Sequence, residues 1–178
     1  MCKSPLHPFL HALPKCEHHM HLEGSLSPAL LFALAARNSI ELPGTDEAFA
    51  SPDSLLDRYT RFSSLDDFLQ YYYIGMNCLI HENDFEQLAW EYFLRAKSDG
   101  VVHAEVFFDP QAHTGRGVKY ETVVDGFERA CKRAEAVLGI STKLILCFLR
   151  HLPVPESHTM FDQAHDDLLK ATITRFSA

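Results

Sequence analysis

The alternation of apolar and polar positions along this chain predicts strands separated by helices. Short runs without Gly or Pro are compatible with strands, and the second and third of the runs given next also carry the β-branched and aromatic residues that strands favour. The predicted strands are residues 15–22, 101–108 and 142–149. Apolar stripes at helical spacing predict helices. These cover residues 64–80, 120–138 and 156–170, with two more that begin near residues 28 and 83. Residues 43–52 are predicted to form a polar, turn-rich loop.

Capping residues indicate where several of these helices begin. Ser27 before a proline suits an N-cap with Pro at the first helical position. Ser64 with Asp67 three residues later resembles a capping box, and Asn83 with Glu86 has the same spacing.

The predicted order is strand, three helices, strand, helix, strand, helix. Residues 109–141 separate the last two strands, which is the length of a crossover with its helix. Strands and amphipathic helices in this order predict an α/β fold with a parallel sheet. Three βα units, with extra helices after the first strand, would form only part of a (β/α)₈ TIM barrel, which takes about 250 residues.

Composition excludes several classes of protein. The 178 residues include 16 basic and 24 acidic side chains, a net charge of −8 that argues against nucleic acid and anionic membranes as partners. The longest apolar run, residues 29–36, is too short to cross a bilayer. Five scattered cysteines without a C-x-x-C pair indicate reduced thiols. We expect a cytoplasmic protein that is not secreted, with a nuclear location also open.

The first predicted strand carries a row of polar side chains on one face. Alternation predicts Glu17, His19, His21 and Glu23 on that face. The opposite face would then carry Cys16, His18, Met20 and Leu22. Buried polar groups need compensation, and a metal ion held by the two imidazoles would provide it. A solvated histidine cluster is the alternative interpretation.

Three segments resemble the adenosine/adenine deaminase family, and most of all its adenine deaminase branch in fungi and bacteria. They are PKCEHHMHLEGSLSPALL, DDFLQYYYIG and AEVFFDPQAHTGRGV. The resemblance covers residues 13–163. It implies a zinc-dependent (β/α)₈ barrel that hydrolyses adenine to hypoxanthine and ammonia in purine salvage. Adenosine deamination, giving inosine, is the alternative reaction.

The resemblance also implies roles for individual residues. His19 and His21 match two ligands of a single Zn²⁺ ion. Glu23 matches the acidic position that faces the substrate. Adenosine deaminases usually have Asp there, where it meets the ribose of adenosine. The longer Glu side chain would reach into the space that is left when the substrate, adenine, has no ribose. Leu65, Phe68, Leu69 and Tyr72 match a helix that shields the purine from water, although ordinary core packing is the more common explanation for any one of these residues.

The sequence also departs from the family. The remaining zinc ligands and the glutamate proton donor of the family have no counterpart in this chain, so we assign no catalytic residue. We interpret residues 1–163 as the N-terminal portion of a purine deaminase barrel and residues 164–178 as an unmatched tail. A truncated, inactive form that holds zinc weakly or not at all is therefore expected, and a non-catalytic interaction module is the alternative. The oligomeric state is not indicated.

Overall fold

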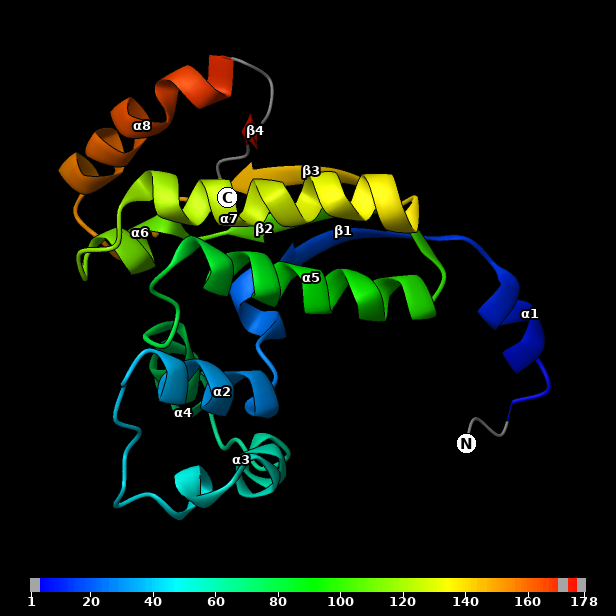
Figure 1. Cartoon of the computed structure of the whole chain (residues 1–178), viewed down its shortest axis with the longest axis horizontal. Coiled ribbons are helices and arrows are strands. Elements are labelled where there is room, and N and C mark those ends of the chain that lie inside the picture. The colour runs from blue at the N-terminus through cyan, green and yellow to red at the C-terminus, as the bar shows by residue number, and fades with distance from the viewer. Residues whose placement is uncertain (1–3, 170–172, 176–178) are drawn as a thin grey trace.

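The computed structural model describes residues 4–169 and 173–175 and contains a parallel sheet with the strand order β1-β2-β3-β4. The strands are β1 (Lys15–His21), β2 (Val101–Phe108), β3 (Ser141–Leu146) and β4 (Ile173–Arg175). The helices are α1 (His7–Ala12), α2 (Pro28–Arg37), α3 (Pro52–Tyr59), α4 (Leu65–Met76), α5 (Glu82–Ser98), α6 (Pro110–Thr114), α7 (Tyr120–Arg133) and α8 (Val154–Leu169). Helices α5 and α7 lie side by side along the sheet, and α2, α3 and α4 form a separate group next to it (Figure 1).

The predicted α/β class with parallel strands is confirmed, and so are the three predicted strands. The structure adds a short fourth strand, β4, which pairs in parallel with β3 inside the predicted tail. A strand of three residues is too short to produce a readable alternation. The division of the chain at residue 163 stays a prediction.

The predicted loop over residues 43–52 is only partly a loop. Residues Glu47–Ala50 form a 3₁₀ turn, and Phe49 is buried. Helix α3 follows at once, with Ser51 as its N-cap. The sequence pattern missed α3 because its eight residues place only Leu55 fully in the core.

Helix starts follow the predicted caps in two of three cases. The Ser27 hydroxyl accepts a hydrogen bond from the Leu30 amide at 3.2 Å, and Ser64 accepts one from Asp67 at 3.1 Å. Helix α5, however, begins at Glu82 and not at Asn83. The 64–80 helix also ends early, at Met76. In the described part of the chain, no helix is long and apolar enough to span a bilayer.

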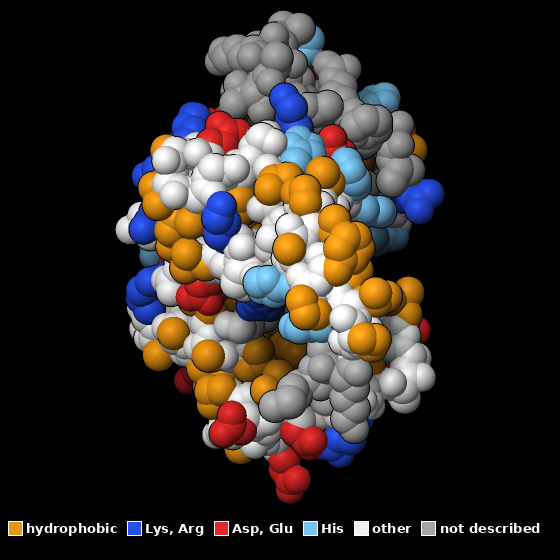
Figure 2. Space-filling view, turned by 90° about the vertical axis from the view of Figure 1, so that its right-hand side faces the viewer, with side chains coloured by type: hydrophobic (Ala, Val, Ile, Leu, Met, Phe, Trp, Pro, Cys, Tyr) orange, Lys and Arg blue, Asp and Glu red, His pale blue; other side chains and the backbone are white. Residues whose placement is uncertain are grey.

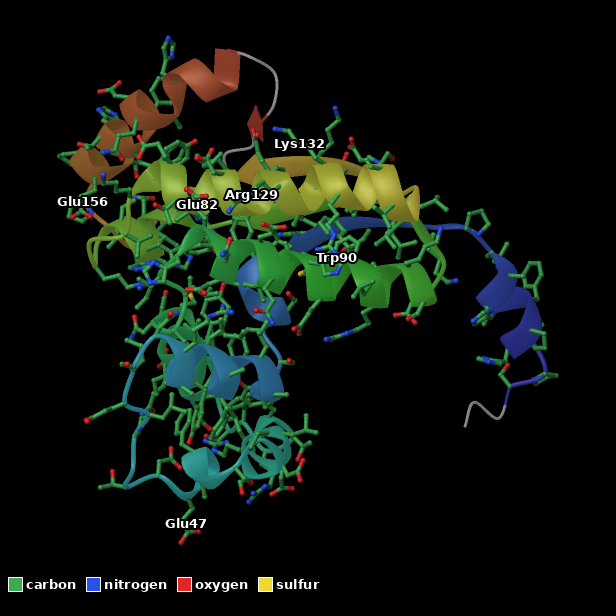
Figure 3. The ribbon with its side chains drawn as sticks, viewed as in Figure 1. Glu47, Glu82, Trp90, Arg129, Lys132 and Glu156 are labelled. Carbon is green, nitrogen blue, oxygen red and sulfur yellow. The ribbon has the colours of Figure 1, made fainter. Side chains whose placement is uncertain are left out.

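Helices α5 and α7 approach each other closely at Gly126. A Cβ atom at this position would lie 2.5 Å from the Glu82 carbonyl oxygen and 2.7 Å from the Phe85 Cβ. Just beyond the contact, the Arg129 guanidinium lies 2.8 Å from the Glu82 carboxylate, and these two side chains meet between the helices (Figure 3). Only glycine therefore permits this spacing of the two helices.

Gly126→Ala should destabilise the protein even though alanine favours helices. The added methyl group has to push α5 away from α7, and we expect the free energy of unfolding to fall by about 1–3 kcal/mol. Urea titration followed by circular dichroism measures this change. Gly44→Ala, where an added Cβ has no neighbour within 4 Å, is the control. Equal stability of the two variants would contradict the close contact.

The carboxylate of Asp84 joins α2 to the start of α5. It is 1% exposed and pairs with the guanidinium of Arg37. Its Oδ2 also accepts hydrogen bonds from the Asn38 side chain at 2.7 Å and from the Ile80 and His81 amides at 2.9 and 2.8 Å. Burial raises the pKa of Asp84, but these donors outweigh burial and leave the pKa below its ordinary value.

Because the folded pKa of Asp84 is lowered, its contribution to stability is present above the ordinary carboxyl pKa of about 4 and is lost as the pH falls below it. Asp84→Asn should lower the free energy of unfolding by about 1–3 kcal/mol at pH 7. The difference in the free energy of unfolding between Asp84→Asn and the wild type should then become smaller as the pH is lowered below about 4. Urea titrations across pH measure both effects, with the exposed Asp162→Asn as control. A gap that does not change with pH would refute this role.

Candidate metal centre and cavity

Strand β1 contains a β-bulge at His18 and His19. Its regular pairing with β2 is interrupted between residues 17 and 20, so these two histidines stand opposite the single residue Glu105. His18 Nδ1 lies 3.3 Å from the Glu105 carboxylate, and the His19 ring lies 4.6 Å from the Phe107 ring. Glu105 and Phe107 are two residues apart and share a face of the sheet. Both histidines therefore lie on that face.

The bulge corrects the predicted faces of this strand. Glu17 was predicted beside His19 and His21, and His18 on the other face. Glu17 is instead paired with Ala104, a fully buried residue on the helix-covered face. A strict alternation cannot survive an inserted residue, so the prediction failed at the bulge.

His19 and His21 lie together, as the alternation predicts. Their ring centroids are 5.7 Å apart, and the His21 ring stacks on Phe107 at 5.5 Å. Two imidazoles at this separation on one strand are the arrangement in which both can turn toward a common ion.

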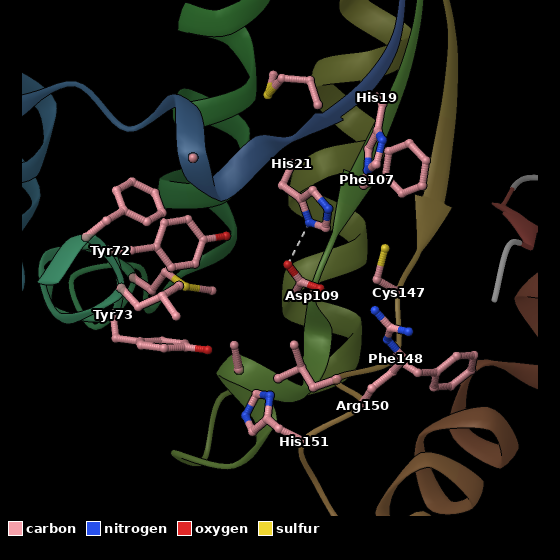
Figure 4. Close-up of a pocket in the computed structure, with 17 residues that line it drawn as sticks. His19, His21, Tyr72, Tyr73, Phe107, Asp109, Cys147, Phe148, Arg150 and His151 are labelled. Atoms are coloured by element: carbon pink, nitrogen blue, oxygen red, sulfur yellow. Dashed lines mark hydrogen bonds and ion pairs between the residues drawn. The ribbon is translucent and has the colours of Figure 1, made fainter. Parts of the chain in front are cut away.

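Asp109 fixes the orientation of His21. The His21 Nδ1 lies 2.8 Å from Asp109 Oδ2, drawn as the dashed line in Figure 4. This hydrogen bond is the main reason that the pKa of His21 is raised. When neutral His21 donates from Nδ1, its Nε2 carries the lone pair that a metal requires.

Cys147 completes a group of three possible donors. Ligand atoms of His21, Asp109 and Cys147 all lie within 4.8 Å of one another. Burial and the nearby Asp109 raise the pKa of the Cys147 thiol to about 12, so it is protonated at neutral pH. Imidazole nitrogen and carboxylate oxygen are donors that zinc accepts, whereas a thiol has to lose its proton first. The residues therefore fit a zinc ion mainly through the imidazoles.

Sequence reasoning missed Asp109 and Cys147. Asp109 directly follows the predicted strand 101–108, and Cys147 lies just after β3. Since β1, β2 and β3 are parallel, their carboxyl ends meet at one edge of the sheet. For Asp109 that signal was available but was applied only to the first strand, whereas Cys147 fell inside the predicted strand 142–149.

A cavity of about 1050 Å³ opens beside the histidines. His19 and His21 line one side of it, and Phe68, Leu69 and Tyr72 of α4 line another (Figure 4). Burial is the main reason that the pKa of Tyr72 is raised, so its hydroxyl stays a hydrogen-bond donor. The structure thus brings together five of the predicted site residues.

Leu65 and Glu23 do not line this cavity. Leu65, the first residue of α4, is 69% exposed. Leu65 lies one helical turn before Phe68 and Leu69, beyond the part of α4 that lines the cavity.

Glu23 is fully buried behind the cavity wall. Its Oε1 accepts a hydrogen bond from the Asp109 amide at 2.9 Å and lies 3.3 Å from Nε2 of the buried His113. Its Oε2 has no hydrogen-bond partner among the described residues. Glu23 also borders a pocket of about 40 Å³ that shares Phe68 and Tyr72 with the large cavity.

The sequence resembles fungal adenine deaminases over most of its length. The chain is 59% identical to the adenine deaminase of Aspergillus fumigatus over 166 residues, 92% of this chain and 47% of that protein. Identity to the adenine deaminase of Schizosaccharomyces pombe is 56% over 164 residues, 92% of this chain and 45% of that protein. The chain therefore spans about half the length of these curated relatives.

Solved structures of related proteins share the fold. The adenine deaminase of Arthrobacter aurescens superposes with a TM-score of 0.83 at 41% identity, over 94% of this chain and 50% of that chain. An amidohydrolase of Burkholderia ambifaria with bound zinc gives 0.79 at 22% identity, over 100% of this chain and 48% of that chain. The predicted fold, an incomplete (β/α)₈ barrel with parallel strands, is thus confirmed.

The model of the family described as adenosine deaminase matches residues 14–176. A match over so much of the sequence, together with the strand-borne histidine pair, shows that this chain belongs to the adenosine deaminase family.

Proposed function

We propose that this chain supplies the metal-binding strand and one wall of the purine site of a zinc-dependent adenine deaminase, which hydrolyses adenine to hypoxanthine and ammonia. One observation carries the proposal. His21, oriented by Asp109, stands beside His19 at the edge of a cavity with an aromatic wall. Relatives at more than half identity are named adenine deaminases.

His19 and His21 would hold a single zinc ion. Zinc, when bound, supplies a nucleophile at neutral pH by lowering the pKa of water. Asp109 keeps the His21 ring in place and supports its ligand nitrogen. Because two imidazoles are fewer than the three or four ligands of known zinc sites, we expect this chain alone to bind zinc weakly.

The aromatic side of the cavity would bind the purine. Phe68 and Tyr72, whose rings lie 5.7 Å apart, offer flat apolar surfaces for a heterocycle, and Leu69 lies beside them in the cavity wall. Covering the base in this way also excludes water from it. The contact proposed for Leu65 stays a prediction.

Glu23 would select the free base from the small pocket that it borders, which shares Phe68 and Tyr72 with the large cavity. A buried carboxylate oxygen without a partner among the described residues is costly, and an N–H of a purine ring is a donor that satisfies it. In adenosine the ring nitrogen that carries this proton in adenine is bonded to ribose, so it cannot donate a hydrogen bond. The carboxylate therefore favours adenine over adenosine, the alternative substrate.

Replacing Asp109 by Asn should weaken zinc binding about 10- to 100-fold, because the ligand His21 loses its charged partner. Competition with a chromophoric chelator measures the affinity. His158→Ala removes an exposed histidine on α8 and serves as control. Unchanged affinity in Asp109→Asn would show that His21 is not a ligand or that Asp109 does not support it.

Adenine should bind to the chain in excess zinc at least about tenfold more tightly than adenosine, a difference of about 1.4 kcal/mol. Glu23→Gln should remove most of this preference, whereas the exposed Glu41→Gln should keep it. Calorimetric titration measures the affinities.

Release of ammonia from adenine is the second readout, and we expect none from this chain alone. Turnover that His19→Ala/His21→Ala abolishes would show that the chain carries a complete site. Equal binding of both compounds would contradict the role of Glu23, tighter binding of adenosine would favour adenosine deamination, and binding of neither would favour a non-catalytic module.

A further inference from the structure

A row of three polar side chains lies behind the cavity wall. Arg116 Nη2 lies 2.9 Å from Nδ1 of His113, and His113 Nε2 lies 3.3 Å from Oε1 of Glu23. Several histidines are visible at the surface in Figure 2, whereas the side chains of His113 and Glu23 have no exposed surface. The proposed zinc ligands do not explain why an imidazole and a guanidinium lie at this depth.

The guanidinium of Arg116 fixes the tautomer of His113. A guanidinium only donates hydrogen bonds, so Nδ1 of His113 has to accept one and carries no proton. The single ring proton is then on Nε2, which faces the Glu23 carboxylate. His113 is thus a neutral imidazole that donates a hydrogen bond to Glu23.

Arg116 and His113 are themselves held in place. Arg116 Nη2 donates to the carbonyl oxygens of Met76, at 2.9 Å, and of Leu79. These carbonyls lie at and just after the end of α4, the helix that provides the aromatic wall of the cavity. The Phe85 ring meets the His113 ring edge-on, with the ring centroids 4.9 Å apart. The imidazole therefore has little room to turn.

The two carboxylate oxygens of Glu23 have different surroundings. Oε1 accepts the hydrogen bond from His113 and another from the amide of Asp109 at 2.9 Å. Oε2 is also buried but has no hydrogen-bond partner among the described residues. Two donors on one oxygen oppose a rotation that would exchange the two oxygens. The free oxygen therefore stays in one position, on a residue that borders the small pocket beside Phe68 and Tyr72.

We propose that His113 is a positioning residue for the purine site, a role that rests on the adenine site proposed above. By holding Oε1 of Glu23, it keeps Oε2 free to accept a hydrogen bond from the ring N–H of adenine. A carboxylate that is oriented before the base arrives needs little further ordering on binding. Selection of the free base is then shared between Glu23, which would contact the base, and His113, which would not.

NMR of the ¹⁵N-labelled chain tests this row of side chains without any ligand. Two-bond ¹H–¹⁵N spectra distinguish a proton on Nε2 from one on Nδ1, and the signals of His113 are those that His113→Gln removes. We expect the proton on Nε2. Its resonance should move upfield in Glu23→Gln, because a neutral amide oxygen accepts a weaker hydrogen bond than a carboxylate. The exposed Glu41→Gln is the control and should leave this resonance unchanged.

Calorimetric titration with adenine and with adenosine, in excess zinc, tests the effect on selection. His113→Phe keeps a flat ring at the buried position but has no donor for Glu23. Its preference for adenine should fall about tenfold, with the affinity for adenosine unchanged. His113→Gln, whose amide both donates and accepts, should keep most of the preference. His158→Phe, at an exposed position on α8, is the control, and circular dichroism checks that each variant is folded.

Three results would overturn the role of His113. One is a proton on Nδ1, or an Nε2 proton that does not respond to Glu23→Gln. Another is an undiminished preference for adenine in folded His113→Phe, which leaves the proposed function intact. The third is an equal loss of affinity for both compounds, which indicates packing alone. If the wild type shows no preference while the Nε2 proton responds to Glu23→Gln, the proposed function fails and the positioning of Glu23 by His113 stands.

Discussion

The whole site depends on the parallel pairing of β1, β2 and β3. Parallel strands bring their carboxyl ends to one edge, so residues far apart in the sequence meet there. His21 ends the first strand, Asp109 follows the second and Cys147 follows the third. The sheet also holds His21 and Asp109 at hydrogen-bonding distance from each other. The histidine side of the cavity is therefore set by this alignment.

Burial separates the roles of the carboxyl groups near the cavity. Glu23 is fully buried and accepts a backbone hydrogen bond, whereas Asp109 keeps some access to solvent and orients an imidazole. The two are connected, because the amide of Asp109 is the donor to Glu23. A shift of Glu23 would therefore move Asp109, and through Asp109 it would change the orientation of His21. The proposed metal-binding strand and the proposed purine-selecting carboxylate are therefore connected through Asp109.

Much of the fold could be predicted from the sequence, because apolar runs and caps report local structure. The three longer strands and the N-caps at Ser27 and Ser64 follow from that information. The bulge in β1 could not be predicted, since it is a property of the pairing with β2 and leaves no mark in the alternation. The position of Asp109 at the carboxyl end of β2 could have been predicted, whereas the burial of Glu23 depends on the packing of α4 and could not.

The hydrogen bonds of the buried Asp84 have a consequence for the aromatic wall of the cavity, which α4 provides. Asp84 accepts the amides of Ile80 and His81, and Asn38 binds the carbonyl of Cys78, so the segment after α4 is anchored at several atoms. The other end of α4 begins at the exposed Leu65. The amino end of α4 is nevertheless fixed as well, because Asp67 pairs with Arg58 of α3 and the Tyr71 hydroxyl donates to Asp46 at 2.6 Å. An aromatic wall that is fixed at both ends needs little ordering when a ligand binds against it, which lowers the entropic cost of binding.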